Sequence, residues 1–174
     1  YKNGKGATVV NSRVIDPFNG NRSWSIEAIR APLGLRRWTN EDVTPRPDDI
    51  FQERLYCIRW SNPNGERRYS APDEDDLTRE QKALELLQGK FAEWQEKGFI
   101  PSKKIESGYN TDQPIRERGW THWHHLFTPR QLLAYGNYLS KADSRLSTAA
   151  RVSLCLKIAT QTNWNSRLNI WNAN

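Results

Sequence analysis

The stretch Arg118-Gly-Trp-Thr-His-Trp-His-His-Leu-Phe-Thr-Pro-Arg-Gln-Leu-Leu133 determines where one of the main helices begins. Thr128 is a favoured N-cap residue, a proline follows at the first helical position, and Gln131 stands at N3, where it completes a capping box. Phe127 and Leu132 occupy the N′ and N4 positions, at which apolar side chains form a hydrophobic staple. We therefore predict a rigid helix start at this point of the chain.

The same stretch concentrates aromatic and basic residues. It contains two tryptophans, all three histidines of the protein and Arg130 in the first turn of the expected helix. A helix N-terminus with basic and aromatic neighbours is a favourable seat for phosphate. The sequence therefore indicates a candidate phosphate contact here.

The three histidines allow more than one interpretation. A helix places His122 and His125 on one face with His124 elsewhere, and a strand pairs His122 with His124. Neither arrangement brings all three to one metal ion, and no carboxylate stands at a suitable offset. We therefore expect helix-surface and capping roles around Trp120 and Trp123. Metal binding and a phosphate or partner contact remain alternatives.

The rest of the chain indicates an α+β fold, with a β-hairpin region at residues 1–72 and a helical region at residues 73–174. Asn19-Gly20 and Asn64-Gly65 are signals for hairpin turns. They predict one hairpin with arms at residues 8–16 and 23–30, and a second with arms at residues 51–60 and 66–71.

Three main helices are expected after the hairpins. The first begins at Asp73 and ends near residue 97, the second begins at Thr128, and the third ends near Thr162 after a break at residues 143–144. Two apolar stripes with helical spacing predict inner faces. They consist of Leu77, Leu84, Leu87, Phe91 and Trp94 in the first helix, and of Leu146, Ala149, Val152, Leu156 and Ala159 in the third.

The net charge of +6 is unevenly distributed over 174 residues, a length that suits one domain. Residues 1–70 carry 12 basic and 8 acidic side chains, residues 71–98 carry 4 and 8, and residues 99–174 carry 10 and 4. Two basic parts around an acidic helix suit a protein that contacts a polyanion on one side, although surface solvation explains the acidic helix equally well. No segment has the length and apolarity of a membrane span, and we expect a cytoplasmic protein.

Arg36-Arg-Trp38 is a basic and aromatic cluster in a proline-broken loop. It can meet a nucleic-acid backbone and a base, or its arginine stems can cover a buried tryptophan. The sequence favours neither interpretation.

Several segments together carry a resemblance to a known family. They are Phe51-Gln-Glu-Arg-Leu-Tyr-Cys-Ile-Arg-Trp60, Tyr69-Ser-Ala-Pro72, Phe91-Ala-Glu-Trp-Gln-Glu-Lys-Gly-Phe-Ile-Pro101, Gly108-Tyr-Asn-Thr-Asp-Gln-Pro-Ile115, Leu126-Phe-Thr-Pro-Arg-Gln-Leu-Leu133 and Asn165-Ser-Arg-Leu168. In these segments the chain resembles the adenine-specific DNA methylases that carry a zinc-ribbon-type insert, bacterial enzymes often found beside defence genes. The resemblance implies a fragment of a larger α/β methyltransferase that uses S-adenosylmethionine.

The two catalytic motifs of such an enzyme are missing. The sequence has no Pro-Pro dipeptide for the tetrapeptide that grips the target amine, and Asp16-Pro-Phe-Asn-Gly-Asn21 has one glycine where the cofactor turn needs two. Cys57 and Cys155 cannot form a four-cysteine zinc ribbon, and we expect both to be buried free thiols. The chain starts with Tyr1 and contains no methionine. We therefore expect a piece from between the catalytic motifs, with no catalytic, cofactor or metal residues of its own.

By resemblance, the whole enzyme transfers a methyl group to the exocyclic amine of a flipped adenine. This segment is then expected to engage DNA or to act as a scaffold, with DNA and the remaining parts of the same polypeptide or complex as partners. The alternatives are a stand-alone nucleic-acid-binding module of a defence system and a metal-dependent hydrolase. The candidate DNA-contacting residues are Arg36, Arg37, Lys103, Lys104, Arg116, Arg118 and Arg130 for phosphate, Trp38, Tyr109 and Trp120 for base stacking, and Arg167, which the resemblance places toward the active site.

Overall fold

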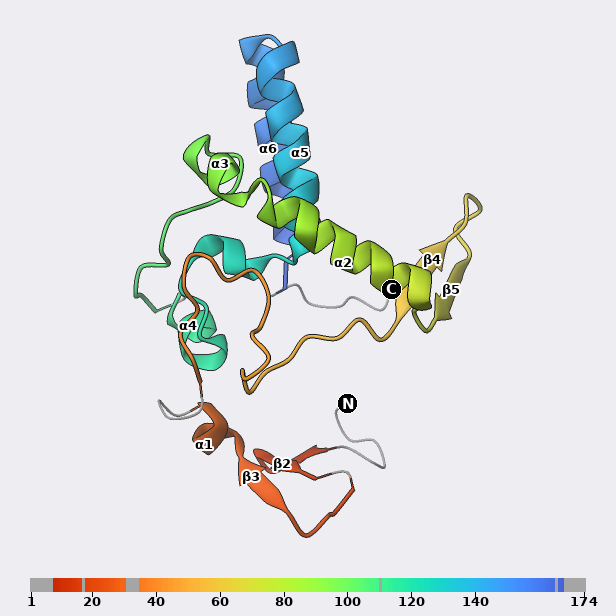
Figure 1. The fold of residues 1–174 in the computed structure, drawn as a ribbon, viewed down its shortest axis with the longest axis vertical. Helices are drawn as coiled ribbons and strands as arrows, with labels where there is room; N and C mark the ends of the chain where they lie inside the picture. Colours follow the sequence, from red (N-terminus) through yellow and green to blue (C-terminus); the bar gives the residue numbers. More distant parts are fainter. Residues whose placement is uncertain (1–7, 17, 31–34, 110, 165, 168–174) are drawn as a thin grey trace.

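The computed structural model describes residues 8–16, 18–30, 35–109, 111–164 and 166–167, and for residues 143–145 and 163–164 only the backbone. Two small antiparallel sheets and several helices give the expected α+β fold (Figure 1). The strands are β1 (Val9–Val10), β2 (Arg13–Ile15), β3 (Ser23–Ser25), β4 (Ile58–Ser61) and β5 (Arg67–Ser70). The α-helices are α1 (Ile26–Arg30), α2 (Glu74–Gln88), α3 (Phe91–Glu96), α4 (Asp112–Arg118), α5 (Pro129–Arg145) and α6 (Thr148–Trp164), and η1 (Trp123–Leu126) is a 3₁₀ turn.

The first sheet has the order β1-β2-β3, and its second predicted arm is too long. β2 pairs with β3 as expected, with Val14 opposite Trp24. The predicted arm runs to residue 30, whereas β3 ends at Ser25 and α1 follows. The cause is local, because the Ser25 hydroxyl accepts a hydrogen bond from the Ala28 N–H at 3.0 Å and so caps a helix start.

The second sheet is the β4–β5 hairpin, and its turn lies at Asn64-Gly65 as predicted. The glycine has φ of +82°, and the Asn62 N–H donates to the Glu66 carbonyl at 3.0 Å to close the turn. The first arm is shorter than predicted, because β4 begins at Ile58. Before this strand, Glu53 makes a tertiary contact instead, an ion pair with Arg167.

The long helix predicted from Asp73 breaks at Gly89 into α2 and α3. Asp73 forms the expected N-cap, since its carboxylate accepts the Asp76 N–H at 2.8 Å and the Asp76 carboxylate accepts the Asp73 N–H at 3.2 Å. At the break, Lys90 has φ of −120°, outside helical geometry. The acidic first turn of α2 is consistent with the helix dipole.

The main core lies where α2, α3 and α5 meet. Leu87, Trp94 and Ile100 are buried there with Leu132 of α5, so most of the first predicted stripe is inner as expected, although Leu77 is 44% exposed. The Thr128 capping box is confirmed, because the Gln131 side chain accepts the Thr128 N–H at 2.8 Å. A Cβ at Gly136 of α5 would overlap the ring of Trp94, so only glycine permits this close approach.

The inner face predicted for α6 is wrong. Val152 is 54% exposed and Leu156 is 66% exposed, and the helix packs instead through half-buried residues that include Leu154 and Ile158. α5 and α6 form a two-helix hairpin that projects from the body (Figure 1), so α6 has few neighbours to cover its apolar side chains. Cys155 on this helix is exposed rather than buried, for the same reason.

The connector before η1 positions the candidate site. The region expected to be a loop up to Ile115 contains the start of α4 at Asp112. α4 ends at Gly119, whose φ is +74° and whose Cβ position would overlap the Arg36 carbonyl oxygen. The Trp38 N–H donates to the Gly119 carbonyl at 2.9 Å, so two segments far apart in sequence lie side by side.

Candidate nucleic-acid interface

Two of the candidate stacking groups form a buried cluster. Trp38 and Trp120 are each 6% exposed, and their rings pack edge to face with centroids 6.3 Å apart. The His125 ring lies 5.1 Å from Trp38, and the Arg167 guanidinium lies 5.6 Å and 5.7 Å from the two tryptophan rings. We call these four residues the Trp–Arg cluster. Neither tryptophan is free to stack on a base, so their predicted role is wrong and their role is packing.

Arg167 holds the end of the described chain onto this cluster. Its guanidinium donates to the carbonyl oxygens of His125 at 2.7 Å and Val43 at 3.1 Å, and to the Glu53 carboxylate at 2.9 Å. Burial lowers the pKa of Arg167, while Glu53 opposes this shift. Its side chain is 6% exposed, so it is a structural arginine and not an accessible phosphate contact.

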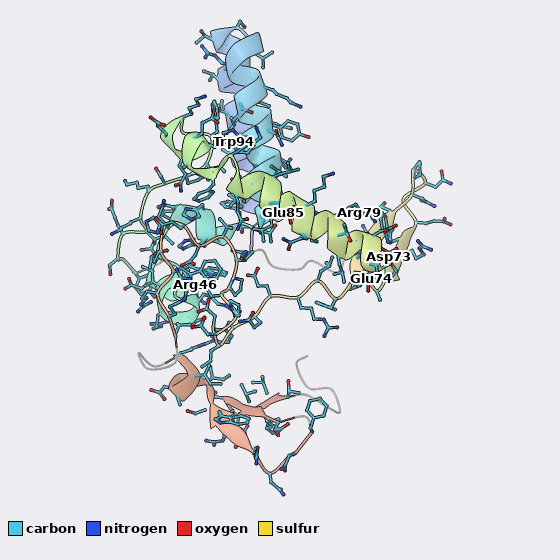
Figure 2. All side chains as sticks on the ribbon, viewed as in Figure 1. Arg46, Asp73, Glu74, Arg79, Glu85 and Trp94 are labelled. Carbon is cyan, nitrogen blue, oxygen red and sulfur yellow. The ribbon has the colours of Figure 1, made fainter. Side chains whose placement is uncertain are left out.

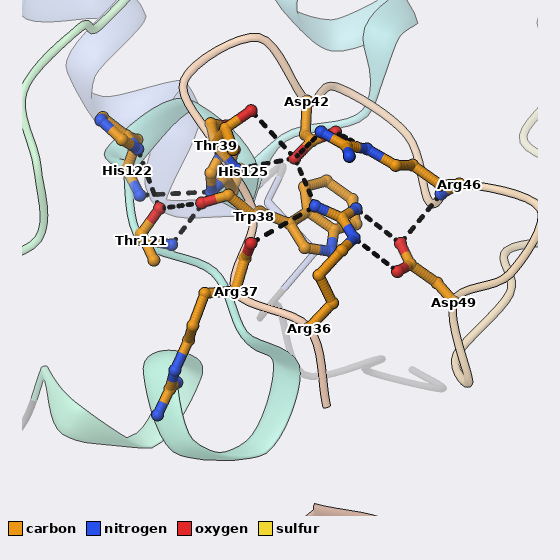
Figure 3. Close-up of polar contacts among 10 residues, drawn as sticks. All are labelled: Arg36, Arg37, Trp38, Thr39, Asp42, Arg46, Asp49, Thr121, His122 and His125. Atoms are coloured by element: carbon orange, nitrogen blue, oxygen red, sulfur yellow. Dashed lines mark hydrogen bonds and ion pairs between the residues drawn. The ribbon is translucent and has the colours of Figure 1, made fainter. Parts of the chain in front are cut away.

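Arg36 is neutralised by a carboxylate network (Figure 3). It donates to both oxygens of Asp49 at 2.7 Å and to Asp42 at 2.6 Å, and its hydrogen bonding to Asp49 is the main cause of its raised pKa. Burial raises the pKa of Asp42, but hydrogen bonds from Arg36, Thr39 and Arg46 outweigh it and bring the pKa to about 2. Arg36 also lies 6.0 Å from the Trp38 ring. Of the two interpretations of this cluster, an arginine covering a buried tryptophan is therefore correct for Arg36.

His125 has a fixed tautomer. Its Nδ1 accepts the backbone N–H groups of Thr121 at 3.0 Å and His122 at 3.2 Å, so its Nε2 carries the proton and donates to the Thr39 carbonyl at 2.9 Å. Burial, with an added contribution from His124, lowers the pKa of His125 to about 3. The expected capping role is confirmed, since this ring satisfies two backbone donors before η1, but the expected surface position is wrong.

His124 and His122 are buried beside it. Nδ1 of His124 donates to the Pro101 carbonyl at 3.1 Å, and its Nε2 has no hydrogen-bond partner in the described part of the chain. Burial lowers the pKa of His124 to about 4, and burial with nearby Lys104 lowers the pKa of His122. Among the described residues, no group of three or more His, Cys, Asp or Glu side chains is arranged to hold a metal ion.

Arg37 and Lys104 border an open groove outside the buried network. Figure 3 shows the Arg37 side chain pointing away from Asp42 and Asp49, toward α4, where it donates to the Ile115 carbonyl. Both basic side chains are exposed. The groove has a volume of about 590 Å³, and it is lined by Arg37, Trp38, Thr39, Asn40, Lys104, Ile105, Ile115, Thr121 and His122.

The remaining candidates are exposed but lie outside the lining of this groove. Tyr109 is fully exposed, and Arg118 lies 5.1 Å from the Phe51 ring. Three others form surface ion pairs, which leave the charge accessible because such pairs are weak. These pairs are Lys103 with Glu106, Arg116 with Glu117, and Arg130 with Glu80.

Sequence reasoning did not single out the β4–β5 hairpin as a candidate surface. Arg59, Arg67 and Arg68 are exposed on it, together with Trp60 (45%) and Tyr69 (55%). The signal was present, because arginine and aromatic residues are adjacent in both predicted strands, as Arg59-Trp60 and Arg68-Tyr69. Strand alternation places such residues on two faces at once.

The sequence that imitates a cofactor turn does not have the required geometry. Residue 16 and residues 18–22 lie between β2 and β3, where the Asp16 carboxylate accepts the Phe18 N–H at 2.9 Å and the Phe18 ring is 98% exposed. A cofactor turn joins a strand to a helix whose N-terminus faces the ligand. The described residues of this loop therefore do not fit S-adenosylmethionine.

Comparison with known proteins found no matching protein-family model, curated protein or solved structure. The resemblance to the methylases thus remains an expectation that rests on the sequence motifs. In the described part of the chain, no helix combines the length and apolarity needed to cross a bilayer.

Proposed function

We propose that this chain is a segment of an S-adenosylmethionine-dependent, adenine-specific DNA methyltransferase, in which it acts as a scaffold and contacts DNA. The observation that supports this most directly is that the motifs carrying the resemblance meet in space. Arg167 of the last motif bonds Glu53 of the first at 2.9 Å, and its backbone N–H donates to Leu126 at 2.7 Å. Phe127, which like Leu126 belongs to the motif at residues 126–133, packs against the core that contains Ile100 of the motif at residues 91–101. Contacts between these motifs support a scaffold role.

The DNA contacts are assigned first to the exposed basic residues that line the groove. Arg37 and Lys104 come from different segments, and both are exposed in the lining of the groove. Exposed cations neutralise phosphates and release counterions, which gives affinity without base specificity. The buried Trp38 lines this groove, whereas Arg36 and Trp120 lie outside its lining.

The proposal places the cofactor in other parts of the enzyme, because the residues 16–22 loop does not fit it. S-adenosylmethionine supplies the methyl group when it is bound there. The role of this segment is to hold the duplex, so we expect DNA affinity that does not depend on the cofactor.

The test is a titration of a labelled duplex with the protein at its full encoded length, at low and physiological salt, with and without S-adenosylmethionine. We expect salt-sensitive binding that the cofactor leaves unchanged. The double variant Arg37→Gln/Lys104→Gln should reduce the salt slope by about 0.9 for each phosphate that is no longer neutralised. The matched control Lys82→Gln/Lys157→Gln removes two exposed cations from α2 and α6 and should leave the slope unchanged.

Absence of duplex binding at low salt would overturn the proposed DNA contact. Methyl transfer is measured separately, with labelled S-adenosylmethionine and adenine-containing duplex. Duplex binding without any transfer of label would instead support the stand-alone nucleic-acid-binding module.

A further inference from the structure

The β4–β5 hairpin is a ribbon that is exposed on both faces. Its register pairs Arg59 with Tyr69 and Trp60 with Arg68, and every residue from 59 to 69 is exposed. The hairpin extends away from the start of α2 (Figure 1), and Figure 2 shows Asp73 and Glu74 close to its base. It therefore presents side chains on two sides instead of covering the core.

The hairpin is held in shape by its own hydrogen bonds. The Trp60 indole N–H donates to the Ser70 hydroxyl across the strands at 3.0 Å. At the turn, the Asn62 side chain accepts the Glu66 N–H at 2.8 Å and donates to the Glu66 carboxylate at 2.6 Å. An isolated two-stranded hairpin is only marginally stable in water, so these bonds preserve a shape that the core does not impose.

Both faces of the hairpin carry arginine and an aromatic ring. Because side chains alternate along a strand, Trp60 and Arg68 share one face, while Arg59, Arg67 and Tyr69 share the other. Residues 58–70 carry three arginines and one acidic residue, Glu66. The ribbon is therefore net positive, in contrast to the acidic first turn of α2.

This combination of shape and charge fits duplex DNA. The major groove of B-DNA is about 12 Å wide and admits a two-stranded β-ribbon. Guanidinium groups bind phosphate oxygens in bidentate geometry, and a ribbon with arginines on both faces can reach the phosphates on both sides of a groove. An open hollow of about 740 Å³ at the turn end of the ribbon is lined by Trp60, Ser61, Asn62, Glu66, Arg67 and Arg68.

We infer that the β4–β5 hairpin enters the major groove of duplex DNA, with Arg59, Arg67 and Arg68 on phosphates and Trp60 against the groove wall. This inference rests on the proposed function, which supplies duplex DNA as the partner. It assigns a second contact surface, separate from the Arg37–Lys104 groove. The enzyme then holds its duplex at two places, one of them on a projecting ribbon.

The experiment measures duplex binding by fluorescence anisotropy over a salt series, with the protein at its full encoded length. The variant Arg59→Gln/Arg67→Gln/Arg68→Gln should weaken binding by about tenfold or more at physiological salt and lower the salt slope by about 0.9 for each arginine that had neutralised a phosphate. The control Lys82→Gln/Lys141→Gln/Lys157→Gln removes the same charge from exposed positions on α2, α5 and α6 and should change neither. Circular dichroism checks that both variants keep their helices.

Two further variants separate the possible outcomes. Trp60→Ala should weaken binding to duplex without changing the salt slope, because it removes no charge. If the hairpin triple variant binds like the control while Arg37→Gln/Lys104→Gln loses binding, the hairpin inference is wrong and the proposed DNA contact stands. If the unaltered protein binds no duplex, the DNA contact itself is wrong. If the triple variant loses affinity for a polyglutamate chain as much as it loses affinity for duplex, the hairpin recognises acidic partners in general, and the inference is wrong.

Discussion

The Trp–Arg cluster and the β4–β5 hairpin use the same residue types in opposite ways. In the cluster, Trp38 is 6% exposed and Arg167 lies between two tryptophan rings. In the hairpin, Trp60 is 45% exposed and Arg68 stands opposite it on an open face. Residue type alone therefore does not separate a structural arginine from one available to a ligand.

Burial makes the difference. Beside the cluster, Arg36 meets Asp42 and Asp49, and within it Arg167 meets Glu53 and two backbone carbonyl oxygens. On the hairpin, Arg59, Arg67 and Arg68 are exposed. A basic and aromatic cluster is thus structural where its side chains are buried, and it is open to a ligand where they are exposed.

The largest expected effect is acid destabilisation of the buried histidines beside the cluster. Burial lowers the pKa of His124 to about 4 and of His125 to about 3, below the value of about 6.5 in the unfolded chain. Below pH 6.5 the unfolded state binds more protons, so stability is complete above that pH and is lost as pH falls toward 3. We expect the free energy of unfolding to drop by about 4 kcal/mol between pH 7 and pH 4.5, measured by urea denaturation.

The variant His124→Gln serves as the control for this pH dependence. It removes one of the two shifted groups, so the slope of stability against pH should become about half as steep in the same range. An unfolding free energy that stays constant from pH 7 to pH 4.5 would show that these rings are not buried as described.

The next effect compares one arginine from each region. Arg167→Met leaves Glu53 and two carbonyl oxygens without their donor, and we expect a loss of about 3 kcal/mol in the free energy of unfolding. The matched change Arg68→Met in the hairpin should cost less than about 0.5 kcal/mol, because that side chain is exposed. Equal losses for the two variants would remove the distinction between the regions.

Local signals predicted much of the fold. The helix start at Asp73, the capping box at Thr128 and the turn at Asn64-Gly65 depend on residues within a few positions of each other, and all three are confirmed. Longer-range features were harder to predict. The stripe around Leu156 has helical spacing, but spacing does not say whether a neighbouring element is present to cover it, and this one is exposed.

Sequence reasoning placed some of the candidate site residues on the surface correctly and others not. Arg37 and Lys104 are exposed beside one groove, whereas Trp38, Trp120 and Arg167 are buried together. Their burial depends on contacts between residues far apart in the sequence, which no local pattern reports. Sequence proximity to acids gave a usable hint, since Asp42 and Asp49 follow Arg36 closely.

The last comparison, between one tryptophan of the hairpin and one of the cluster, tests the hairpin directly. Trp60→Ala removes a half-exposed ring and its bond to Ser70, and cross-strand contacts of this kind contribute about 0.5 kcal/mol. The matched change Trp38→Ala removes a buried ring and should cost about 4 kcal/mol. Both are measured by urea denaturation at pH 7, where the histidines are neutral in the folded and mostly neutral in the unfolded state. A loss above about 2 kcal/mol for Trp60→Ala would mean that the hairpin belongs to the core, and its arginines could then not enter a DNA groove without unfolding it.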